Sequence, residues 1–197
     1  MIIGYHIIFG AYGFWLPNDP RGSWSEQIWA RHLRPFGKAT KVTTRRSLAH
    51  DTHDHARRIR AKQHLKYPAV RFSGLQARAV GRGFSQVVQD LELRVYACAI
   101  MPDHVHLVTG RHRRNAEDIA GFLKRAGTRR LNAEGLHPVR GHRQTNGRIP
   151  SPWAEQGWCV YLDTLEEMHQ RIRYVEENPV EAGLARQRWP FVVVFER

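Results

Sequence analysis

One strand–turn–strand pattern constrains the fold of this chain more than any other stretch. Val95–Ile100 is a short run of small, apolar and β-branched residues, which is typical of a buried strand. Pro102-Asp103 then interrupts the pattern with residues that favour a turn. In His104–Val108, histidine alternates with aliphatic residues, which predicts a second strand with histidines on one face and aliphatic side chains in the core.

His104 and His106 are therefore candidates for a metal site. Two imidazoles side by side next to a turn can hold one divalent ion and leave coordination positions open for a substrate. The same spacing is also common in pairs of half-exposed histidines that bind nothing. The spacing alone leaves both interpretations open, and a second group of residues near the C-terminus bears on the choice.

The charge of the chain indicates the class of its partner. Among 197 residues, 31 are Lys or Arg and 18 are Asp or Glu, so the formal net charge is +13. A positive surplus of this size predicts binding to a polyanion, most often a nucleic acid. An origin in an organism with arginine-rich proteins is the alternative explanation.

Other global features predict a folded protein of the cytoplasm. The chain has no apolar run long enough to span a membrane, and its first residues lack the basic region and cleavage pattern of a signal peptide. We therefore expect no membrane partner. Cys98 and Cys159 lie in apolar, strand-like segments, where buried thiols are expected rather than a disulfide.

The length fits a single domain over residues 1–197 with a basic insertion at about 16–71. The insertion is rich in Arg, His and Thr and shows no convincing period, apart from a short helix around Ala56–Leu65. Hydrophobic patterns predict strands at Tyr5–Phe9 and Trp158–Leu162, and helices from Gly74 to about Leu91 and from Ala116 to about Glu134.

The helix predicted at 116–134 has a basic surface. Asn115, followed by Asp118 three residues later, favours the start of a helix. Four basic residues lie off its apolar stripe and could follow a phosphate backbone: Lys124, Arg125, Arg129 and Arg130. A merely solvated face explains the same pattern equally well.

A last helix is predicted near the C-terminus. Asp163 and Glu166 form a capping box that starts the helix. Pro179 restricts the residue before it, so the helix is expected to end at about residue 177 or 178.

Tyr174 is the unusual residue of this helix. The apolar stripe consists of Leu165, Met168, Ile172 and Val175. At ~100° per residue, Tyr174 lies roughly opposite the centre of that stripe, with Asn178 one turn away. From position alone, an ordinary exposed tyrosine is the simpler explanation.

Two separate motifs together resemble a known family. Met101-Pro-Asp-His-Val-His-Leu-Val108 and the downstream Tyr174-Val-Glu-Glu-Asn-Pro-Val-Glu-Ala-Gly-Leu184 resemble the single-tyrosine HUH transposases, particularly the REP-associated tyrosine transposases. The resemblance implies an α+β fold of the ferredoxin or RRM-like kind, with a central antiparallel sheet and helices packed mainly on one face. It covers roughly residues 75–191 and the first strand.

The resemblance also implies roles for individual residues. Tyr174 would be the nucleophile, and His104, His106 and Asn178 would bind Mg²⁺ or Mn²⁺. The implied reaction is nicking and rejoining of single-stranded DNA through a 5′-phosphotyrosine intermediate, as in DNA transposition. A substrate with DNA hairpins, a location in the bacterial cytosol and a monomeric or homodimeric protein are further expectations.

Three alternative functions remain at this stage. A non-catalytic hairpin-binding protein would keep the fold and the charge without using the site. A two-histidine phosphoesterase would need two His-x-Ser/Thr motifs, and the sequence contains no such pair. Replication initiators and relaxases, the larger HUH relatives, usually carry additional domains.

Overall fold

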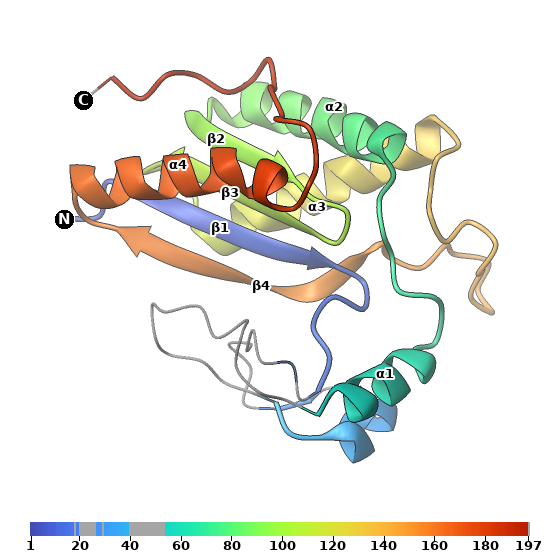
Figure 1. The fold of residues 1–197 in the computed structure, drawn as a ribbon. Helices are drawn as coiled ribbons and strands as arrows, with labels where there is room; N and C mark the ends of the chain where they lie inside the picture. Colours follow the sequence, from blue (N-terminus) through green and yellow to red (C-terminus); the bar gives the residue numbers. More distant parts are fainter. Residues whose placement is uncertain (18, 20–26, 29, 40–53, 197) are drawn as a thin grey trace.

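Four antiparallel strands lie at the centre of the part of the chain that the structure describes. The structure is a computed structural model, and it describes residues 1–17, 19, 27–28, 30–39 and 54–196. The strands follow the order β2-β3-β1-β4 across the sheet (Figure 1). Their bounds are Gly4–Ala11 for β1, Val95–Ile100 for β2, His104–Gly110 for β3 and Trp153–Leu162 for β4. The predicted α+β fold with a central antiparallel sheet is confirmed.

The pairing of β1 with β3 separates apolar from polar side chains. Ile7 lies opposite Leu107, and successive side chains along each strand point to opposite faces. One face carries buried apolar residues of both strands: Tyr5, Ile7, Phe9, Val105 and Leu107. The other face carries three histidines: His6, His104 and His106. The predicted alternation in β3 is therefore confirmed.

Helices cover both faces of this sheet. α2 (Gly74–Leu91) and α3 (Ala116–Ala133) pack on the apolar face, where Phe84 and Ile119 are fully buried. α4 (Leu165–Glu181) crosses the opposite face and contacts β2 and β3 (Figure 1). Two of these three long helices thus share one face, as predicted, and the third lies over the histidines.

Side-chain caps determine where α3 and α4 begin. Asn115 Oδ1 accepts a hydrogen bond from the Asp118 N–H at 2.7 Å, so the predicted start of α3 is confirmed. α4 is capped by Thr164, whose hydroxyl accepts from the Glu167 N–H at 3.1 Å. The predicted cap, Asp163, lies one residue too early, because a threonine can cap a helix in the same way as an aspartate.

α4 also ends later than predicted. The helix continues past Pro179 and ends at Glu181. A proline inside a helix removes one backbone hydrogen bond and disfavours helical geometry in the preceding residue, but it does not forbid the helix. Here Pro179 is buried and lies in the last turn of α4. Leu165, which was predicted in the apolar stripe, is 46% exposed.

A short helix forms within the predicted basic insertion. α1 (His55–Gln63) confirms the helix expected around residues 56–65. It packs beside the 3₁₀ helix η1 (Arg31–Phe36) in a small apolar cluster that also includes Leu16. Residues 40–53 of the insertion lie outside the described residues, and the domain bounds stay a prediction.

The C-terminal segment runs along β2. Gln187 Oε1 accepts from the Ile100 N–H at 2.8 Å, and Gln187 Nε2 donates to the Ile100 carbonyl at 2.9 Å. Farther along, the Val193 N–H donates to the Val95 carbonyl at 2.8 Å. One side-chain amide and one backbone amide therefore attach this segment to the strand.

Two global expectations concern thiols and the membrane. Cys98 and Cys159 are buried free thiols, as predicted, and burial raises the pKa of both.

None of the helices in the described ranges has the length and apolar character that a membrane crossing requires.

Lys124 has a different environment from the one predicted for it. Its ammonium donates to three backbone carbonyls at the start of β4, those of Ala154, Glu155 and Gln156, at 2.9, 3.2 and 3.2 Å. It also lies 5.5 Å from the centre of the Phe9 ring. Burial lowers the pKa of Lys124 to about 8. Lys124 thus joins α3 to β4 instead of extending from the basic surface.

We predict that Lys124→Met destabilises the protein by about 1–3 kcal/mol at pH 7, because three carbonyls lose a charged donor. Arg129→Met is the matched control: Arg129 is exposed on the same helix, and its loss should change the free energy of unfolding by less than about 0.5 kcal/mol. Urea unfolding of both variants measures the difference. Equal losses would show that the Lys124 contacts contribute no net stability.

Candidate active site

The site begins with two histidines on β3. His104 and His106 point to the α4 face, with ring centroids 4.8 Å apart and ring planes at 88°. Two imidazoles bound to one ion at ~2.1 Å and at ordinary coordination angles have centroids roughly 4.6–5.3 Å apart. The spacing of this pair therefore fits a shared divalent ion.

A hydrogen bond holds one nitrogen of each of these rings. His104 Nδ1 lies 2.7 Å from Asp103 Oδ1, and His106 Nδ1 lies 3.0 Å from His6 Nε2. A carboxylate only accepts hydrogen bonds, so His104 donates from Nδ1, and the neutral form of this ring has its lone pair on Nε2, where a ligand can bind. The Phe14 ring, 4.8 Å from the His104 ring between centroids, packs against this imidazole.

Burial keeps the inner two histidines neutral. Desolvation, followed by the charge of Arg171, lowers the pKa of His6 to about 3. Desolvation also holds the pKa of His106 well below its ordinary value, with further lowering by His104, His6 and Arg171. Only neutral imidazoles have a lone pair, so at pH 7 both rings can accept a hydrogen bond or bind a metal ion.

Tyr174 lies beside these histidines. From α4 its ring meets the ring of His106 at 5.4 Å and the ring of His6 at 6.0 Å between centroids, edge to face in both cases. The side chain is 40% exposed. Tyr174 is thus at the margin of the buried side of α4, closer to the sheet than a position opposite the apolar stripe.

The surroundings of Tyr174 act on its pKa in opposite directions. Burial is the largest effect and raises the pKa above its ordinary value of about 10. The charge of Arg171 and a side-chain hydrogen bond with Asn178 lower it, while Glu181 raises it. A hydrogen bond that lowers the pKa of a phenol is one that stabilises the phenolate.

The predicted site residues are brought together only in part. The three residues His104, His106 and Tyr174 form one group, and Asn178 joins it through Tyr174. Within the described ranges, no group of three or more His, Cys, Asp and Glu side chains is arranged to hold a metal ion. Binding of Asn178 to a metal ion stays a prediction.

Three of the predicted DNA contacts lie away from this group. Arg125, Arg129 and Arg130 are exposed on α3, which packs on the opposite face of the sheet from α4. Arg125 stacks at 4.7 Å over the Phe122 ring, and Arg130 Nε lies 3.5 Å from Glu134 Oε1. Contact of these arginines with DNA stays a prediction.

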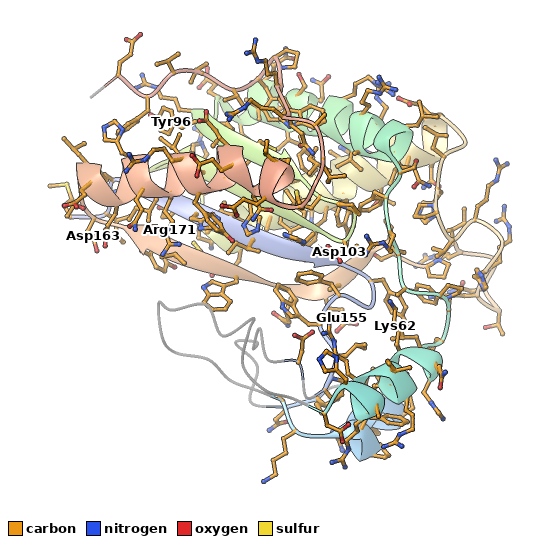
Figure 2. All side chains as sticks on the ribbon, in the orientation of Figure 1. Lys62, Tyr96, Asp103, Glu155, Asp163 and Arg171 are labelled. Atoms are coloured by element: carbon orange, nitrogen blue, oxygen red, sulfur yellow. The ribbon has the colours of Figure 1, made fainter. Side chains whose placement is uncertain are left out.

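Sequence reasoning missed two members of the site, His6 and Arg171. Figure 2 labels Arg171 on α4 and Asp103 in the turn before β3. The charge of Arg171 acts on both His6 and His106. Arg171 precedes Tyr174 by three positions, which places both on the same side of a helix. His6 alternates with the apolar residues of the first predicted strand. This alternation places it on the opposite face of the strand from the core, and it is the sequence pattern that could have identified His6.

Proteins similar to this chain are found among solved structures. Scans of protein-family models and of curated proteins found no match. Among solved structures, the chain is similar to a REP-associated tyrosine transposase bound to a REP hairpin, with 12% identity, a TM-score of 0.49, and coverage of 96% of this chain and 74% of that one. It is also similar to a candidate transposase from Deinococcus radiodurans R1, with 15% identity, a TM-score of 0.41, and coverage of 94% and 93%. Because both TM-scores are below 0.5, neither similarity supports a conclusion about this chain, and a function has to be inferred from the residues of the site.

Proposed function

We propose that this protein is a tyrosine transposase that nicks and rejoins single-stranded DNA. One observation carries the proposal: the Tyr174 ring on α4 lies 5.4 Å from the His106 ring on β3. The two residues belong to separate sequence motifs, and the fold places them together. Metal-assisted phosphoryl transfer needs a nucleophile close to side chains that can bind a metal ion, and here a tyrosine lies beside two such imidazoles.

The chemistry follows from the phenol of Tyr174. Once its proton is lost, the phenolate oxygen attacks the phosphorus of a phosphodiester. The bond from phosphorus to the 3′ oxygen breaks, the 3′ oxygen takes up a proton, and a 5′-phosphotyrosine remains. Attack by a 3′-hydroxyl on that linkage restores a phosphodiester and releases Tyr174. Since the covalent link conserves the phosphodiester, rejoining needs no ATP.

Two residues of α4 assist this step. The raised pKa keeps Tyr174 protonated at pH 7, so the phenolate must be stabilised as it forms. The charge of Arg171 and the side-chain hydrogen bond with Asn178 both lower the pKa of Tyr174 and so favour its anion. Arg171 also supplies positive charge where a DNA phosphate would approach Tyr174.

The donor set fits Mg²⁺ or Mn²⁺ held by His104, His106 and the amide oxygen of Asn178. Bound there, the ion would supply charge that neutralises a non-bridging phosphate oxygen. Two imidazoles and one amide are neutral ligands, so the protein alone should bind the ion weakly, and a DNA phosphate should strengthen binding. This differs from a structural zinc site, which has four closed ligands.

The proposed substrate is single-stranded DNA that carries hairpins. The strand has to bend toward the half-buried Tyr174 so that the phosphate meets the phenol oxygen in line. A duplex is stiffer over this length and bends less easily. The net charge of +13 provides the electrostatic attraction. The resemblance of the two motifs leads us to propose also that the protein recognises hairpins and acts as a monomer or homodimer.

We predict that Tyr174→Phe abolishes the covalent protein–DNA adduct and leaves DNA affinity within about twofold. The reaction contains labelled single-stranded hairpin DNA from the sequence that flanks the gene, with Mn²⁺, and a denaturing gel detects the adduct. Tyr161→Phe is the control, because Tyr161 is 42% exposed but packs beside Tyr5 on the other face of the sheet. An adduct in the Tyr174 variant would refute this nucleophile. Tight binding without any wild-type adduct would favour the non-catalytic hairpin-binding protein.

Removal of the metal should stop the same reaction. We expect chelation by EDTA to abolish the adduct, and His104→Ala and His106→Ala to slow its formation by at least about 100-fold, since each removes a predicted ligand. His142→Ala, at an exposed histidine outside the site, should react like the wild type. Adduct formation that is insensitive to both chelator and histidine loss would contradict the proposed metal role.

Arg171 should contact a phosphate of the bound strand. We predict that Arg171→Gln reduces the slope of log affinity against log salt by about 0.7, the value for one lost phosphate contact on a single strand. Arg173→Gln removes the same charge from an exposed position two residues away and should leave the slope closer to that of the wild type. Fluorescence anisotropy over a salt series measures both, and the same titration of Arg129→Gln tests the predicted contact by α3. Equal slopes for Arg171→Gln and the wild type would exclude this contact.

A further inference from the structure

His6 is a buried polar residue next to the proposed metal ligands, and no sequence motif includes it. It lies on β1 and is 1% exposed. Its ring stacks on His106 with centroids 5.2 Å apart and planes at 27°. Its Nε2 is 3.0 Å from His106 Nδ1, within hydrogen-bond distance.

The hydrogen bonding of His6 is concentrated on this one contact. Its other nitrogen, Nδ1, is buried and has no hydrogen-bond partner among the described residues. Burying a polar group in this way costs free energy, and an aliphatic residue would fill a strand position without that cost. Val108, which pairs directly with His6 across the strands, shows that an aliphatic residue fits this face. The free energy that burial of His6 costs therefore indicates that this histidine has a role, and its hydrogen bond indicates that the role concerns His106.

We propose that His6 is a positioning residue that accepts a hydrogen bond from His106 Nδ1–H and so keeps the Nε2 lone pair of His106 available to the divalent ion. This inference rests on the proposed function, because it assigns His6 a role in the same site. A neutral imidazole carries one N–H. If that proton is on Nδ1 of His106, Nε2 is free for a metal; if His6 donates instead, the proton of His106 moves to Nε2 and blocks it.

The two proposed ligands are therefore held in different ways. Asp103 can only accept, so the orientation of the His104 hydrogen bond is fixed by its partner. His6 can donate or accept, so metal binding at His106 and the direction of the His6–His106 bond depend on each other. Partners of this kind orient metal-binding histidines in other sites, and their loss lowers metal affinity by about 10–100-fold.

The test compares three variants of the full chain by their affinity for Mn²⁺. His6→Leu removes the acceptor, His6→Gln places an amide where Nε2 lay, and Val108→Ala perturbs packing beside His6 without touching the bond. Electron paramagnetic resonance of free Mn²⁺ gives the dissociation constant, with single-stranded DNA present and absent. Long-range ¹H–¹⁵N spectra with Mg²⁺ show which nitrogen of His106 carries the proton.

We expect His6→Leu to weaken Mn²⁺ binding by about 10–100-fold. His6→Gln should stay within about threefold of the wild type, Val108→Ala should bind Mn²⁺ normally, and in the wild type the proton of His106 should be on Nδ1. Unchanged affinity in His6→Leu would overturn the role of His6 and leave the proposed function intact. An equal loss in Val108→Ala would assign the effect to packing and also overturn it. Absence of Mn²⁺ binding by the wild type, with and without DNA, would overturn the metal-dependent function and this inference together.

Discussion

The register of β1 against β3 is the constraint on which the rest of the site depends. With Ile7 opposite Leu107, the apolar residues of both strands face α2 and α3, and the histidines face α4. A slip of one residue in this pairing would move the histidines of one strand into the apolar core. The burial of Ile7, Phe9 and Leu107 therefore stabilises the protein and also aligns His6 with His106.

Burial in the site favours the histidines as metal ligands but disfavours the tyrosine as a nucleophile. Desolvation keeps His6 and His106 neutral, which a metal ligand and its hydrogen-bond partner require. Desolvation also raises the pKa of Tyr174, which works against a nucleophile. Arg171 and Asn178 act on Tyr174 in the favourable direction. α4 thus provides both the reactive group and the residues that offset the effect of its burial.

Local patterns in the sequence predicted much of the fold, because periodicity reports which side of an element is buried. The alternation around His106, the periods of α2 and α3 and the short α1 all agree with the structure. The ends of α4 were wrong by a few residues, since capping and proline preferences bias a helix boundary without fixing it.

The residues that sequence reasoning missed depend on tertiary contacts. The strand register places His6 beside His106, and the sequence of a single segment cannot reveal that contact. Lys124 looked like a surface cation because its position on the helix is polar, but a long side chain can reach carbonyls of a neighbouring strand. Tyr174 was identified by its motif, and its contact with His106 required the placement of α4 over β3.

The attachment of the C-terminal segment has a consequence for self-association. In the part of the chain that the structure describes, β2 and β4 are the outermost strands of the sheet. Along β2, Gln187 already satisfies both backbone groups of Ile100 that a neighbouring strand would use. Along β4, Lys124 occupies three carbonyls at the start of the strand. A second copy that paired with either strand at these positions would have to break these contacts, so they hinder edge-to-edge addition there.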